Sequence, residues 1–248
     1  MLWGSFLGVV AHRIPKRESI YVPRSHCDSC RRTLPWQELI PFKTWIIGGG
    51  KCVFCRSPLS FKILIPEVLT GLFFATIPFL GKTWQEMALY GLFFSFALPL
   101  SIIDFEHRRL PHALTLLAAI TGLLSEWAFS RFSMDVSALA FPAAGYLAGF
   151  LPFAIISLLH PRGLGMGDAF WLGAIGTFVG PFGVLETLLL STASATGSAV
   201  LYWIAKKRSI ETGPLNNIVI PFGPFLSFGG IVTLIWGPSL TKFLIAIL

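Results

Sequence analysis

The sequence predicts an all-α polytopic membrane protein with about eight transmembrane helices and a small cytosolic loop domain. Three observations indicate this fold class: few charged residues, repeated apolar runs and a one-sided distribution of Lys and Arg. Of the 248 residues, 54% are hydrophobic and only 12% are charged, whereas soluble domains carry about 25% charged residues. The composition therefore argues against an ordinary soluble enzyme and against a disordered chain.

Eight apolar stretches are separated by short polar or Gly/Pro-rich breaks. A helix needs roughly 20 apolar residues to cross the hydrocarbon core of a bilayer. The first stretch has only about eleven residues, or ~17 Å of helix, so we expect a short or truncated transmembrane helix over 1–12. The predicted spans are 1–11, 63–81, 84–103, 113–130, 136–159, 169–181, 183–205 and 220–247.

Lys and Arg residues lie almost entirely on one side of this topology. If the first span runs from outside to inside, all but Lys82, Arg131 and Lys242 of the 19 Lys and Arg residues fall in the inner segments. The positive-inside rule then places those segments in the cytosol and both termini outside. The inner segments are 13–62, 104–112, 160–168 and 206–219.

All four cysteines lie in the polar loop 13–62, which we predict to be a cytosolic domain preceding the helix bundle 63–248. They form two pairs, Cys27-x-x-Cys30 and Cys52-x-x-Cys55, a pattern typical of a tetrahedral four-cysteine zinc site. Disulfides are the weaker interpretation because cytosolic thiols stay reduced; reduced cysteines without metal remain the alternative. Bound metal would supply much of the folding free energy of so small a domain.

The same loop is basic, and a basic zinc domain can bind nucleic acid. The anionic inner leaflet and the membrane topology already account for such charge, so charge alone does not discriminate. We expect no nucleic-acid partner. His26 precedes Cys27, and we interpret it as a neighbour of the cysteine site and not as a ligand.

Two aspartates stand out among the twelve Asp and Glu residues. Asp104 ends the third predicted span and Asp168 begins the sixth, so both lie at the cytosolic membrane face. Two adjacent carboxylates hold one proton between them and titrate as a unit. One can then take a proton from water while the other polarises a peptide carbonyl. Taken alone, the two acids could equally line a cation path or pair with Arg108 and Arg109.

Short segments along nearly the whole chain resemble, in order, the motifs of one family. They are similar to those of the type IV prepilin peptidases, membrane aspartic proteases with a Gly-x-Gly-Asp motif. Three positions differ from the common pattern: Gly8 replaces an asparagine, His112 an acidic residue and Phe170 a lysine. The similar segments are Gly4–Pro15, Arg24–Cys30, Gly50–Cys55, Ser60 with Glu67–Gly71, Ile103–Pro111, Gly165–Asp168 and Ile220–Phe225.

The resemblance implies that Asp104 and Asp168 are the catalytic pair. It implies a multi-pass protein of the bacterial inner membrane that cleaves the basic leader of type IV prepilins or pseudopilins after a glycine, with its active site facing the cytosol. It also implies N-methylation of the new N-terminus with S-adenosylmethionine, for which Gly50 and Lys51 are candidate binding residues. The competing hypothesis is a non-enzymatic, zinc-stabilised membrane scaffold or transporter. The oligomeric state stays open.

Overall fold

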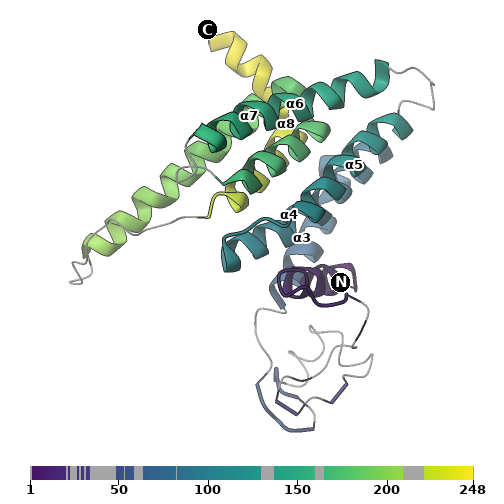
Figure 1. The fold of residues 1–248 in the computed structure, drawn as a ribbon, viewed down its shortest axis with the longest axis vertical. Coiled ribbons are helices and arrows are strands. Elements are labelled where there is room, and N and C mark those ends of the chain that lie inside the picture. Colours follow the sequence, from purple (N-terminus) through teal and green to yellow (C-terminus); the bar gives the residue numbers. More distant parts are fainter. Residues whose placement is uncertain are drawn as a thin grey trace. The chain divides into compact units, whose positions relative to one another are not determined.

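The computed structural model is all-helical in the residues that it describes. These are residues 2–20, 22, 27, 29–30, 32–33, 49–52, 54–58, 64–81, 83–129, 137–159, 165–208 and 221–247. The helices within them are α1 (Leu2–Arg13), α3 (Leu64–Leu80), α4 (Trp84–His107), α5 (His112–Phe129), α6 (Ser137–Leu159), α7 (Met166–Arg208) and α8 (Gly223–Ile247) (Figure 1). The prediction of an all-α fold is confirmed for these residues.

The chain divides into two compact units, residues 1–82 and 83–248. In the first unit α1 packs against α3, and the contact depends on Gly4. A Cβ atom at Gly4 would lie 2.8 Å from the Cα atom of Glu67, so a larger residue there would push the two helices apart. The helix α1 has 12 residues, and its role as a transmembrane helix stays a prediction.

In the second unit, local signals set both ends of α4. Thr83 and Glu86 form a capping box at its start, which satisfies two backbone N–H groups that the helix leaves without partners. At the other end Arg108 adopts the left-handed conformation (φ 53°, ψ 38°), and its N–H donates to the Asp104 carbonyl oxygen. Helix α4 therefore terminates one turn after Asp104, and α5 begins at His112.

Helix α7 packs extensively against both α6 and α8. Glycines allow the close approach of α6 and α7: a Cβ atom on Gly145 or on Gly176 would collide with the backbone of the other residue. A Cβ atom at Gly149 would lie 2.6 Å from the Leu172 carbonyl oxygen. Small residues at such positions are typical of helix packing in membranes, where backbones must approach closely for dispersion forces to act.

Helix α7 is interrupted at Gly180, whose backbone is non-helical (φ 74°, ψ 176°). The break separates the two predicted spans 169–181 and 183–205, which both fall within α7. A positive φ of this kind is open to glycine and strained for other residues, and Pro181 follows it directly. The Gly-Pro break predicted from the sequence is thus present, and it divides α7 into two helical segments that meet at Gly180.

Three of the described helices are long and apolar enough to cross a membrane. They are α4, α6 over Leu139–Leu159 and α7 over Met166–Ala205. Large apolar side chains cover exposed faces of the bundle, as is expected where lipid is the solvent. Membrane helices are therefore supported, and the count of eight spans stays a prediction.

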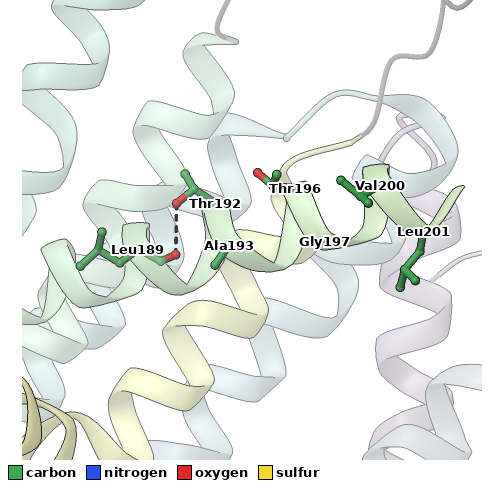
Figure 2. A pocket seen from close by; sticks show the side chains of 7 residues that line it. All are labelled: Leu189, Thr192, Ala193, Thr196, Gly197, Val200 and Leu201. Carbon is green, nitrogen blue, oxygen red and sulfur yellow. Dashed lines mark hydrogen bonds between the residues drawn. The ribbon is translucent and has the colours of Figure 1, made fainter. Parts of the chain in front are cut away.

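The second half of α7 carries such an exposed face. Figure 2 shows a shallow depression along it, where Gly197 has no atom within 4 Å of an added Cβ. The lining residues recur at helical spacing, so they occupy one side of α7. They are Leu189, Thr192, Ala193, Thr196, Gly197, Val200 and Leu201.

Candidate active site

Asp104 lies in the last turn of α4 and is buried, with 6% of its surface exposed. Its Oδ2 atom accepts a hydrogen bond of 2.8 Å from the backbone N–H of Gly223, the first residue of α8. The first N–H groups of a helix have no partner inside it and carry partial positive charge, so a carboxylate there is well placed. The start of α8 therefore fixes one oxygen of Asp104 as a hydrogen-bond acceptor.

Gly223 is the residue type that this approach requires. A Cβ atom added there would lie 2.7 Å from Oδ2 of Asp104 and 3.0 Å from its carboxyl carbon. Any side chain at position 223 must displace either the carboxyl group or the start of α8. The sequence indicated a motif at Ile220–Phe225 but gave no role for it, and this contact supplies one.

Asp168 lies in the first turn of α7 and is only partly buried. Its backbone N–H donates to the carbonyl oxygen of Gly165 at 3.0 Å. Gly167 packs against Leu110, because an added Cβ would lie 3.0 Å from the Leu110 Cβ atom. The glycines thus let the start of α7 approach the segment that follows α4.

The two aspartates are close enough for their charges to interact. The structure therefore brings together the two residues that the sequence placed at one membrane face. Neither Arg108 nor Arg109 forms an ion pair with either aspartate in the described part of the chain, and both arginine side chains are exposed. Two neighbouring carboxyl groups can share one proton. The unprotonated group can then accept a proton from water while the protonated group donates one to a carbonyl oxygen.

Two positions where the chain departs from the family pattern lie in contact. The rings of His112 and Phe170 are 4.8 Å apart and meet edge to face. Phe170 also lies 4.8 Å from the ring of Phe150 on α6. Aromatic packing therefore joins the starts of α5 and α7 beside Asp168, at positions where the resemblance implied charged side chains.

The four cysteines form a second site, in the first unit. All four Sγ atoms lie within 4.8 Å of one another and could hold a metal ion. Cys27 and Cys55, one from each pair, have Sγ atoms 3.7 Å apart. Two thiolates bound to one zinc at ~2.3 Å in tetrahedral geometry are about 3.8 Å apart. The donor set and the spacing therefore fit zinc.

The two cysteine pairs lie in turns with the same backbone hydrogen-bond pattern. The N–H of Cys27 donates to the carbonyl oxygen of Arg32, and the N–H of Cys52 donates to that of Ser57, five residues ahead in each case. The Ser57 hydroxyl lies 3.0 Å from the Sγ atom of Cys55 and 3.5 Å from that of Cys27. Hydrogen bonding to this hydroxyl lowers the pKa of the Cys27 thiol to about 6 and also lowers that of Cys55. The thiolate, the form that binds metal, is therefore favoured at Cys27 and Cys55, whereas burial and the neighbouring thiols raise the pKa of Cys30 to about 11.

Gly50 and Lys51, the candidate cofactor residues, belong to the second cysteine turn. Gly49 and Gly50 have positive φ values of 61° and 67°, and Lys51 forms an antiparallel bridge with Pro58. The turn itself therefore accounts for the glycines. His26, the predicted neighbour of the cysteine site, lies outside the described residues.

Comparison with known proteins gives two matching family models. Residues 1–80 match the bacterial peptidase A24 N-terminal domain, and residues 91–200 match the type IV leader peptidase family. No solved structure matches the chain.

Curated relatives match most of the chain. A type 4 prepilin-like proteins leader peptide-processing enzyme of Escherichia coli is 31% identical over 94% of this chain and 90% of its own length. A prepilin leader peptidase/N-methyltransferase of Pseudomonas aeruginosa is 31% identical over 98% of this chain and 89% of its own length. A Myxococcus xanthus protein of the same name is 32% identical over 83% of this chain and 62% of its own. The chain is thus a protease that belongs to the type IV leader peptidase family.

Proposed function

We propose that this chain cleaves the leader peptide of type IV prepilin or pseudopilin precursors after a glycine, with Asp104 and Asp168 as the catalytic pair. The observation that carries the proposal is that Asp104, at the end of α4, and Asp168, at the start of α7, are close enough for their charges to interact. The names of the relatives supply the substrate class.

The chemistry follows from two carboxyl groups that share one proton. The unprotonated group takes a proton from water as the water oxygen attacks the carbonyl carbon of the glycine. The protonated group donates to the carbonyl oxygen, which becomes a hydroxyl in the tetrahedral intermediate. Collapse of the intermediate breaks the C–N bond, and the leaving amine takes a proton from the pair.

The surroundings of the two aspartates give them unequal roles. Asp104 is buried and its Oδ2 accepts the Gly223 N–H, so we assign proton transfer to its other oxygen, Oδ1. Asp168 is the more accessible of the two. The exposed Arg108 and Arg109 leave the pair unneutralised, which favours approach of a basic leader.

The cellular setting is proposed from charge distribution and family together. The chain is a multi-pass protein of the bacterial inner membrane with its active site at the cytosolic face. Residues 1–12 form the first transmembrane helix, 13–62 the cytosolic domain and 63–248 the peptidase bundle. Zinc held by Cys27, Cys30, Cys52 and Cys55 cross-links the two cysteine turns and stabilises the cytosolic domain.

N-methylation of the new N-terminus is the second proposed activity, supported by the name of the Pseudomonas aeruginosa relative. S-adenosylmethionine is the proposed methyl donor. Gly50 and Lys51 stay the candidate residues for binding it, although the glycine has a structural reason in the turn.

Cleavage of a purified prepilin with a Gly-Phe junction tests the main proposal. The wild-type chain is expected to release the leader, and Asp104→Asn and Asp168→Asn are each expected to abolish release. A non-enzymatic scaffold or transporter, the alternative function, predicts no leader-dependent activity from any of these proteins.

A further inference from the structure

A second hydrogen-bond network lies deeper in the bundle than the aspartates. The indole N–H of Trp171 on α7 donates to the hydroxyl oxygen of Ser227 on α8 at 3.1 Å. The Ser227 hydroxyl in turn lies 3.4 Å from the carbonyl oxygen of Ala97 on α4, to which it donates. Three side-chain and backbone groups thus join three helices.

These are the same three helices that build the aspartate site. Trp171 follows Asp168 by three residues, and Ser227 follows Gly223 by four. Ala97 precedes Asp104 by seven residues, or two turns. Residues at these spacings lie on one face of a helix, so the network lies beneath the aspartates on the same sides of α4, α7 and α8.

The network is enclosed. Trp171 has no exposed surface and Ser227 has 3%. A buried indole N–H that loses its hydrogen-bond partner is destabilising. The Trp171–Ser227 bond therefore favours one rotational setting of α7 against α8.

The aromatic ring of Trp171 is also held by packing contacts that do not involve its N–H. It stacks on Phe93 of α4, with ring centroids 5.9 Å apart and planes at 19°. Gly230 of α8 gives that phenylalanine room, since an added Cβ would lie 2.7 Å from its Cζ atom. Ring packing alone would hold with phenylalanine at position 171, so it does not explain the indole N–H. The hydrogen bond is a separate, directional constraint.

We propose that Trp171 is a positioning residue, whose N–H acts through Ser227 to hold α7 and α8 against α4 so that Asp168 and Asp104 meet in reacting geometry. This inference rests on the proposed catalytic role of the two aspartates. A displacement of about 1 Å in such a pair can cost up to ~100-fold in rate, whereas substrate binding elsewhere on the protein is unchanged.

Three variants test the Trp171–Ser227 hydrogen bond separately from the packing of the Trp171 ring. Trp171→Phe removes the donor and keeps an aromatic ring, although a smaller one, Ser227→Ala removes the hydroxyl that accepts it, and the double variant removes both. Trp203→Phe is the matched control, since Trp203 is an exposed residue of the same helix. Each full-length protein is purified in detergent, its folded fraction is measured by size exclusion, and prepilin cleavage is followed per folded enzyme over a range of pH.

Each single variant is expected to lower kcat about 10-fold with KM within about 2-fold of the wild type. The pH dependence of kcat is expected to shift, because the spacing of the two carboxyl groups sets how they titrate. The double variant is expected to be no slower than Ser227→Ala, since that variant already removes the Trp171 bond along with the Ala97 bond. Trp203→Phe is expected to match the wild type.

Unchanged kcat and pH dependence in Trp171→Phe and Ser227→Ala would overturn the positioning role. Losses that multiply in the double variant would overturn it too, because they would show independent effects of two side chains. If Ser227→Ala does not fold, the kcat and pH dependence of Trp171→Phe are compared with those of Trp203→Phe. Equal values in the two variants would overturn the positioning role. These outcomes are distinct from failure of the proposed function, which shows itself as cleavage surviving in Asp104→Asn and Asp168→Asn.

Discussion

The backbone N–H of Gly223 donates a hydrogen bond of 2.8 Å to Oδ2 of Asp104, across a sequence separation of 119 residues. The bond places a buried carboxyl group at the positive end of α8, the longest helix of the bundle after α7. It also links the last helix of the chain to the proposed catalytic pair. The glycine is required there because an added Cβ would lie 2.7 Å from Oδ2.

Gly223→Ala is expected to reduce leader cleavage about 100-fold, because the new methyl group displaces the Asp104 carboxyl group from its reacting position. The measurement is kcat/KM with a purified prepilin. Gly197→Ala is the matched control, since nothing lies within 4 Å of an added Cβ on that exposed part of α7. Activity of Gly223→Ala equal to that of Gly197→Ala would contradict the contact.

Gly176→Ala is expected to destabilise the bundle by about 1–3 kcal/mol. The added Cβ would collide with the carbonyl group of Gly145, so α6 and α7 must separate. The thermal unfolding midpoint in detergent measures the effect, again beside Gly197→Ala. A midpoint as high in Gly176→Ala as in the control would show that the two helices do not pack this closely.

The purified, reduced chain is expected to hold about one zinc ion. Cys27→Ser or Cys52→Ser is expected to lose that zinc and to expose the cytosolic domain to proteolysis, because metal supplies much of its folding free energy. Ser29→Ala, an exposed change within the first cysteine turn, serves as the control. Metal analysis finding much less than one zinc ion in the wild type would refute the zinc site.

Methyl transfer is expected to be independent of the aspartate pair. With labelled S-adenosylmethionine and a pre-cleaved pilin, Asp168→Asn is expected to label the substrate N-terminus at the wild-type rate, because no peptide bond needs to be broken. The label is counted after gel separation. Absence of transfer by the wild-type chain would remove the second proposed activity.

Much of the site could be predicted from the sequence because its signals are local. Apolar runs predict membrane helices, since a segment in lipid must satisfy its backbone hydrogen bonds internally. The distribution of Lys and Arg then predicts that Asp104 and Asp168 lie at the same membrane face. The spacing of Cys27, Cys30, Cys52 and Cys55 predicts that their thiols meet, and they do.

The rest depends on contacts between distant helices, which no local pattern specifies. The bond from Gly223 to Asp104 and the network through Trp171 and Ser227 join segments that are at least 56 residues apart. The pairing of His112 with Phe170 likewise appears only when α5 meets α7. The break at Gly180, in contrast, is a local feature, and its Gly-Pro step indicated it in the sequence.

The most direct measurement is leader release from a purified prepilin by the wild-type chain, Asp104→Asn and Asp168→Asn, with each protein shown to be folded. The wild type is expected to cleave at the Gly-Phe junction, and each variant to lose at least about 100-fold in kcat, because each removes one half of the acid–base pair. Cleavage at the wild-type rate by either variant would contradict the account.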